Sequence, residues 1–148
     1  MTAKDYLSQI QSNNERIRQL KIIKEHIHIN YTGISAIDYS GDKVQSSPHD
    51  VMFEKGCELL EDIEKIDKEI RRRVETNTKI ALEIQQLNGD DYKYSTILFE
   101  RYYVGKSLTD ISKSMYLDYK YVCQLHGEAL RQFTAQYLTA TFNMTNHD

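Results

Sequence analysis

A seven-residue repeat of branched apolar side chains runs through the middle of this 148-residue chain and constrains its fold most strongly. Spacings of three and four residues place these side chains on one face of an α-helix. Two polar residues, Arg73 and Asn77, interrupt the repeat. The apolar members are Leu59, Ile63, Ile66, Ile70, Ile80, Ile84 and Leu87.

Both ends of this helix carry start and stop signals. Ser47-Pro48-His49-Asp50 offers an N-cap hydroxyl, a proline at the first helical position and an acidic residue in the first turn. Asn88-Gly89 supplies a stop, because these residues tolerate the left-handed conformation that ends helices. The signals predict a helix of nearly 40 residues, which is too long to be stable without a partner.

A second heptad segment precedes the first and supplies that partner. Thr2 and Asp5 fit a capping box, and the pattern predicts a helix over residues 3 to 29. Asn13 and Lys24 fall on its apolar seam, where polar residues commonly fix register and copy number. The apolar seam positions are Ile10, Ile17, Leu20 and Ile27.

Residues 30–47 lack the repeat and contain Gly33 and Gly41, which favours a loop. Two heptad helices joined by a loop most simply form an antiparallel hairpin over residues 1–89. One hairpin leaves Leu60, Val74 and Ala81 uncovered, so we expect pairing between chains, as a dimer or tetramer.

Residues 90–148 change character, with short, tyrosine-rich helical segments separated by tight turns. Helices that cross steeply over a tight turn need apolar residues at fixed inward positions. Ser107 and Asp110 cap the first helix of such a pair, Asp118 caps the second, and Ser112 allows close approach. The predicted fold is therefore all-α, with a C-terminal helix-turn-helix domain. Its inward positions are Ile111, Met115, Leu117, Val122 and Leu125, completed by a preceding helix with Tyr94, Ile97, Leu98 and Tyr102.

Tyr116 occupies the turn position where many such motifs have glycine, so we expect a turn that deviates by one residue. The second helix would enter the major groove with its N-terminal side chains leading. Lys120 suits guanine or phosphate, Gln124 suits adenine, and tyrosine hydroxyls suit phosphates. The alternative is a merely solvated helix face. The predicted DNA-binding residues are Tyr119, Lys120, Tyr121, Cys123, Gln124 and Arg131.

Other functions find little support in the sequence. No apolar run is long enough to cross a membrane and no secretory signal is evident, so we expect a cytoplasmic protein. Cys123 and His126 have zinc-compatible spacing but lack a second pair, and no catalytic motif occurs. We therefore expect no enzyme activity, no metal and no cofactor.

Arg71, Arg72 and Arg73 stand among acidic residues and favour an intrahelical ion-pair face.

The C-terminal segment has an arginine-tyrosine pair before a turn glycine, then an isoleucine and a longer run of spaced residues: Arg101, Tyr102, Gly105, Ile111, Val122, Leu125, His126, Ala129 and Leu130. With these residues it resembles region 4 of bacterial sigma factors and, more closely, the ArpU/RinA-type late-transcription regulators of phages and prophages. Gly-Asp-Lys-Val-Gln-Ser-Ser-Pro at positions 41–48 extends the resemblance upstream. It implies activation of phage late genes in a bacterial host, with duplex DNA and possible contact with host RNA polymerase.

Two alternatives remain open. Small terminase subunits also join a helix-turn-helix to an oligomerising region, which would make this a DNA-packaging protein. A sigma-like module could instead bind RNA polymerase as an adaptor. Residues 91–134 carry six basic and five acidic side chains, so phosphate attraction is weak per copy and avidity would favour an oligomer.

Overall fold

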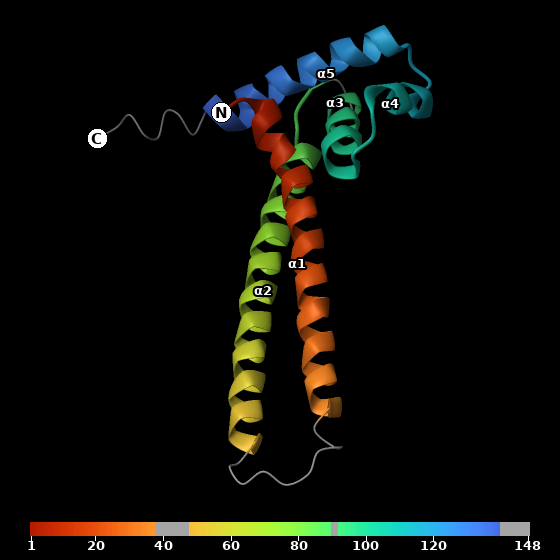
Figure 1. Ribbon diagram of the computed structural model, residues 1–148. Helices are drawn as coiled ribbons and strands as arrows, with labels where there is room; N and C mark the ends of the chain where they lie inside the picture. The colour runs from red at the N-terminus through yellow and green to blue at the C-terminus, as the bar shows by residue number, and fades with distance from the viewer. Residues whose placement is uncertain (38–47, 90–91, 140–148) are drawn as a thin grey trace, which may run out of the picture. The chain divides into compact units, whose positions relative to one another are not determined.

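Every regular element in the described part of the chain is helical, which confirms the all-α prediction. The computed structural model describes residues 1–37, 48–89 and 92–139; for residues 31–37 and 48–52 it describes the backbone alone. Two π-helical turns, η1 (Phe99–Val104) and η2 (Thr134–Leu138), directly follow α3 and α5. The α-helices, labelled in Figure 1, are α1 (Ala3–Ile37), α2 (Pro48–Gln85), α3 (Lys93–Leu98), α4 (Leu108–Met115) and α5 (Tyr119–Phe133).

Helix α1 begins with the predicted capping box but ends later than predicted. The Thr2 hydroxyl accepts the Asp5 backbone N–H at 3.2 Å, and the Asp5 carboxylate accepts the Thr2 N–H at 3.3 Å. The helix continues to Ile37, so the predicted loop is wrong for residues 30–37. One glycine at position 33 costs about 1 kcal/mol, which does not end a helix that is already propagating. Residues 38–47 of that loop lie outside the described residues.

Helix α2 begins at Pro48, as predicted, and its last residue is Gln85. Gly89 follows with a φ of +133°, and a Cβ atom there would collide with the Tyr94 ring. The amide of Gln136 also binds this end of the helix: its Oε1 accepts the Asn88 N–H and its Nε2 donates to the Gln86 carbonyl, both at 2.9 Å. The end of α2 is therefore fixed by contacts with Tyr94 and Gln136 as well as by the local turn signal.

Contacts divide the chain into two compact units that do not coincide with the predicted division at residue 89. Unit 1 contains residues 1–13 and the chain from Val74 onward, and unit 2 contains Asn14–Arg73. Both long helices contribute to both units. The outer ends of the predicted hairpin region thus belong to the same unit as the C-terminal helices.

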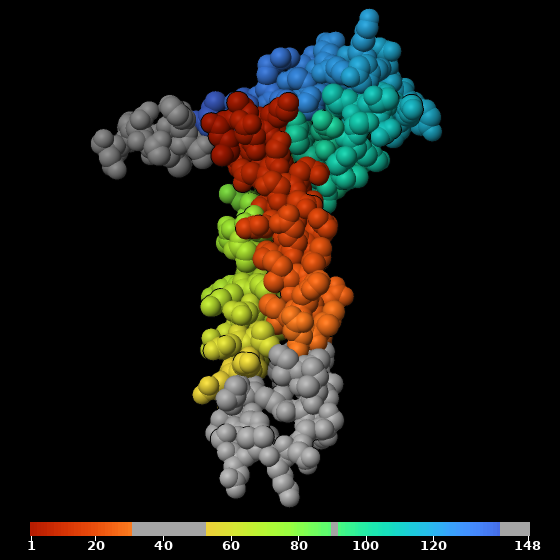
Figure 2. Space-filling view, viewed as in Figure 1, coloured from red at the N-terminus to blue at the C-terminus, as the bar shows by residue number. Residues whose placement is uncertain are grey.

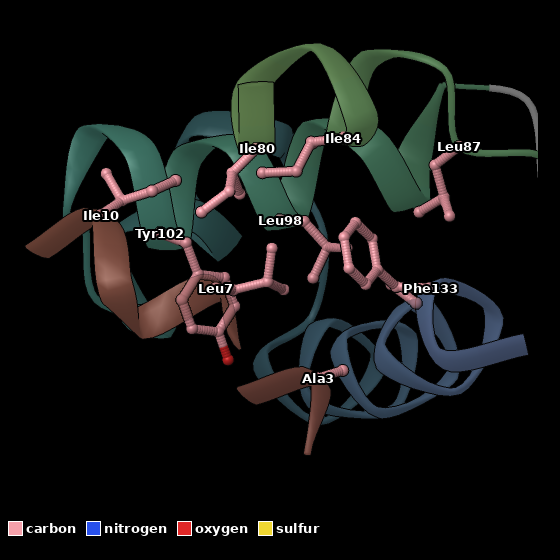
Figure 3. Packing of buried hydrophobic residues seen from close by; sticks show 10 residues of the cluster. Ala3, Leu7, Ile10, Ile80, Ile84, Leu87, Leu98, Tyr102 and Phe133 are labelled. Carbon is pink, nitrogen blue, oxygen red and sulfur yellow. The ribbon is translucent and has the colours of Figure 1, made fainter. Parts of the chain in front are cut away.

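Unit 1 has an extensive apolar core, drawn in Figure 3, to which α1, α2, α3, η1 and α5 all contribute. Leu7, Ile84, Leu98 and Phe133 are all 0% exposed, and burying each such side chain contributes about 1.5–3 kcal/mol. The Phe133 ring packs against the rings of Tyr6 and Tyr137, with centroid separations of 5.8 and 4.9 Å. The buried members are Ala3, Leu7, Ile10, Ile80, Ile84, Leu87, Leu98, Tyr102, Ala129 and Phe133.

Two polar contacts join α1 to α2 within unit 1. Asn13 Nδ2 donates to Asn77 Oδ1 at 2.9 Å, and both residues are buried. The Tyr6 hydroxyl donates to the Glu83 carboxylate at 2.8 Å, and burial together with this carboxylate raises the pKa of Tyr6. The two interruptions of the heptad pattern at Asn13 and Asn77 are therefore one hydrogen-bonded pair.

Unit 2 consists of two helical segments, and its predicted seam is only partly covered. Ile17 is the one buried apolar side chain among the described residues of this unit. Lys24 and Asp67 form an ion pair across the seam at 2.8 Å, with about two fifths of each side chain exposed. The remaining seam residues are half-buried: Leu20, Ile27, Leu59, Ile63, Ile66 and Ile70.

No helix in the described residues is sufficiently long and apolar to span a lipid bilayer.

Candidate nucleic-acid interface

A second apolar cluster in unit 1 holds α3, α4 and α5 together. Ile97, Ile111, Val122 and Leu125 are at most 1% exposed. Met115 and Leu117 are half-buried against them, so all five inward positions predicted between 111 and 125 pack together. Ser112 is also buried, where its small side chain was predicted to allow close approach.

Helix α4 begins at the predicted cap. The Ser107 hydroxyl accepts the Asp110 backbone N–H at 3.2 Å and donates to the Asp110 carboxylate at 2.9 Å. Ser107 itself has extended backbone geometry, as an N-cap residue requires. The sequence therefore located the start of this helix from local chemistry alone.

The turn between α4 and α5 overturns one prediction. We expected the chain to avoid a positive φ at Tyr116, but this residue has a φ of 56° and a ψ of 40°, in the left-handed region. Its N–H bonds the Lys113 carbonyl, and the Leu117 N–H bonds the Ser112 carbonyl. These helix-ending bonds require the left-handed conformation, so packing of the flanking helices outweighs a strain of about 1–2 kcal/mol.

Helix α5 begins at Tyr119, so the predicted N-cap position is confirmed, although the capping hydrogen bond does not form. Asp118 occupies the N-cap position with extended backbone geometry, yet its side chain makes no capping hydrogen bond. The exposed carboxylate still lies near the positive end of the helix dipole. Its charge also opposes any phosphate that approaches the start of α5.

Four of the six predicted DNA-binding residues, Tyr119, Lys120, Tyr121 and Gln124, are exposed on the first two turns of α5. Figure 2 shows the start of this helix, in light blue, at the molecular surface. Cys123 is half-buried beside them. The pKa of Tyr119 is raised, chiefly by its hydrogen bond with the Cys123 thiol. Cys123 is therefore less accessible than predicted.

Neighbouring side chains hold two of these residues. Gln124 Nε2 donates to Glu128 at 3.1 Å, and the other oxygen of Glu128 accepts the Tyr94 hydroxyl at 3.0 Å. The ammonium of Lys93 lies 5.8 Å from the centre of the Tyr121 ring, within the range of a cation–π contact. An adenine contact by Gln124 would have to compete with Glu128.

Arg131, the sixth predicted residue, lies eleven positions after Lys120, which corresponds to about 16 Å along a helix. It is exposed and lines a shallow pocket of about 350 Å³ together with Lys4, Ala3 and Leu130. The sequence did not indicate that the start of α1 lies beside Arg131, since no local pattern relates residues this far apart. The arrangement places two cationic side chains at one pocket, away from the first turns of α5.

Tyr116 is a further surface residue, which the sequence patterns did not indicate. It is 95% exposed, more than any other large apolar or aromatic side chain among the described residues. Lys113, also exposed, lies three residues before it on α4. An aromatic residue at a turn position that favours glycine was the available signal, but it was interpreted only as strain.

His126, which has zinc-compatible spacing with Cys123, bonds a side chain of η1. Its Nε2 is 3.0 Å from the Tyr102 hydroxyl. Burial, with smaller contributions from Arg101 and Lys4, lowers the pKa of His126, while burial raises that of Tyr102. Both shifts favour the uncharged pair, so His126 joins η1 to α5 and contributes no positive charge to the surface.

Among the residues that the structure describes, no three His, Cys, Asp or Glu side chains gather closely enough to hold a metal ion. Compared with protein-family models, curated proteins and solved structures, the chain gives no match in any of the three.

Proposed function

We propose that this protein binds duplex DNA through a helix-turn-helix made by α4 and α5, with the first turns of α5 in the major groove. The observation that carries the proposal is the two-sided character of α5. Val122 and Leu125 are completely buried on one side, while Tyr119, Lys120 and Gln124 are exposed on the other. A recognition helix needs this division, because its core contacts must fix the side chains that reach base edges.

Charge around α5 also supports contact with a polyanion, although weakly. Lys113, Lys120 and Arg131 are exposed, and none of them forms an ion pair with another described residue. These three cations are available for phosphates, which supply much of the affinity in protein–DNA complexes. Tyr116 and Tyr119 add exposed hydroxyls that can donate to phosphate oxygens.

The proposed architecture is a helix-turn-helix carried by an antiparallel hairpin of α1 and α2. The proposed role is that of a transcription regulator acting in a bacterial cytoplasm. Its resemblance to ArpU/RinA-type regulators favours activation of phage late genes. Host RNA polymerase is the protein partner that this role implies.

Selection from a random pool of duplex DNA by the full-length protein tests the proposal directly. Fluorescence anisotropy then compares the selected duplex with a scrambled one. Lys120→Ala and Gln124→Ala should each weaken binding to the selected duplex by about 1–3 kcal/mol and change base preference. Lys113→Ala should weaken binding to both duplexes alike and lower the salt dependence. Lys21→Ala serves as the matched control, because Lys21 is also an exposed lysine but lies on α1, and this change should have no effect.

Failure to enrich any sequence, together with unchanged weak binding in the Lys120 and Gln124 variants, would overturn the proposal. Binding of RNA polymerase in the same preparation would then favour the adaptor function. Rings of eight or more copies that bind DNA without sequence preference would favour the packaging function.

A further inference from the structure

The charges of α2 are divided along the helix in unit 2. Residues 54–64 contain five acidic side chains and one lysine, whereas residues 65–73 contain five basic side chains and two acidic ones. The helix therefore changes from a net charge of −4 to one of +3 between Glu64 and Lys65. At a rise of about 1.5 Å per residue, the two charged halves are each about 13–17 Å long.

Contacts within the chain leave most of these charges unused. Glu69 binds Arg72 and Arg73, and Asp67 binds Lys24. Glu61 and Glu64 stand four residues before Lys65 and Lys68, a spacing that suits helical ion pairs, but neither pair forms. The predicted intrahelical ion-pair face is thus confirmed only around Glu69. The following exposed residues make no ion pair with any described residue: Glu58, Glu61, Glu64, Lys65, Lys68 and Arg71.

Large apolar side chains are exposed on the acidic half of the same helix. Phe53 is 72% exposed and Leu60 is 61% exposed, with the exposed Cys57 between them. Positions 53, 57, 60 and 64 follow a four-three-four spacing, so they lie along one face. This face turns away from the half-buried seam residues, such as Ile63 and Ile66. It therefore combines apolar surface with unneutralised acidic charge.

We propose that this face of α2 binds the same face of a second copy of the chain, with the two helices antiparallel. An antiparallel arrangement places residues 54–64 of each copy against residues 65–73 of the other, so that opposite charges meet twice. A parallel arrangement would place like charges together along the whole contact. The hydrocarbon stems of Lys68 and Arg71 would cover Phe53 and Leu60 of the second copy. One surface that complements itself about a two-fold axis is the usual basis of a homodimer.

Sedimentation equilibrium of the full chain, without DNA, tests the charge pairing separately from the proposed DNA binding. Glu61→Lys with Glu64→Lys makes positions 61, 64, 68 and 71 all positive, and Lys68→Glu with Arg71→Glu makes all four negative. Each double variant should raise the dimer dissociation constant by about tenfold to a hundredfold, because several attractive pairs become repulsive. Circular dichroism verifies that the exposed substitutions leave the helix intact.

The decisive variant combines all four substitutions and exchanges the charges at these four positions. It should restore most of the lost affinity in an antiparallel dimer, because the contacts of positions 61 and 64 with positions 68 and 71 return with their signs reversed. A 1:1 mixture of the two double variants should form a mixed dimer. Lys21→Glu with Lys4→Glu changes the net charge of the chain by the same amount as Lys68→Glu with Arg71→Glu, away from this face. That control should leave the dimer unchanged.

Disulfide trapping measures the orientation independently in a Cys123→Ala background. Cys57 alone should not cross-link, because antiparallel pairing separates the two Cys57 residues by about 20 Å. A cysteine introduced at position 68, 71 or 72 should form an intermolecular disulfide with Cys57 in at least one case. A wild-type protein that is monomeric at 100 μM would overturn the proposal. Rapid cross-linking of Cys57 to itself, or no rescue in the four-substitution variant, would overturn it as well.

Discussion

In each of the two units of this chain, a polar residue on the predicted seam of α1 contacts α2, and the surroundings of these two contacts differ. In unit 1, Asn13 and Asn77 bond each other while buried at 8% and 6% exposure. In unit 2, Lys24 and Asp67 pair with side chains that are 42% and 37% exposed. A buried polar residue that loses its partner bears the full cost of desolvation, whereas an exposed ion recovers hydration.

The same contrast extends to the apolar side chains. In unit 1, additional helices cover the ends of α1 and α2, and most of the buried apolar residues belong to this unit. Two helical segments alone make up unit 2, and they leave Phe53, Leu60 and Ile29 more than half exposed. The heptad pattern is similar in both, so the number of elements packed around a helix determines how far the pattern is buried.

The largest expected effect is on the core of unit 1. Phe133→Ala should reduce the free energy of unfolding by about 3–5 kcal/mol, since it leaves a cavity where this ring is fully buried. The matched change in unit 2, Ile63→Ala, should cost clearly less, because Ile63 is only half-buried. Urea denaturation measured at a concentration below dimer formation gives both values. Equal losses would contradict the contrast between the units.

Next in size is the buried asparagine pair. Asn77→Ala should cost about 1–3 kcal/mol, because the Asn13 amide is left buried without its partner. Replacing both residues with leucine should recover much of this loss and weaken the control of register. A double-mutant cycle measured by urea denaturation provides the coupling energy. A cycle with no coupling would show that the two residues contribute independently.

A gain in stability is expected at Tyr116. Tyr116→Gly should stabilise unit 1 by about 1 kcal/mol, because glycine adopts a φ of 56° without strain and this side chain has almost no packing to lose. Thermal denaturation measures the change, and Tyr116→Ala is the control that retains the strain. Destabilisation by glycine would mean that the tyrosine side chain makes contacts that stabilise the turn.

The smallest effect is expected for the exposed ion pair of unit 2. Lys24→Ala should change the free energy of unfolding by less than about 1 kcal/mol, and 0.5 M salt should remove most of the difference. Lys21→Ala, a change at an unpaired exposed lysine on the same helix, is the matched control. A loss as large as that of Asn77→Ala would show that unit 2 is more tightly packed than its exposure indicates.

Much of the candidate interface was predictable because it depends on short spacings. The Ser107–Asp110 cap and the inward positions from Ile111 to Leu125 follow from residues within one or two helical turns of each other. Partners for the predicted surface residues were not predictable in this way. Gln124 engages Glu128, which in turn engages Tyr94, so its availability depends on a residue 30 positions away.

The sequence by itself determined the helical class, the start of each long helix and the apolar face of α2, since caps and periodicity act over a few residues. Tertiary structure alone decided that residues 1–13 and 74–89 join the C-terminal helices, and that Gln136 closes the end of α2. It also decided that Tyr116 adopts the left-handed conformation. Each of these depends on which surfaces pack together, and packing between distant segments can outweigh local preferences of about 1 kcal/mol.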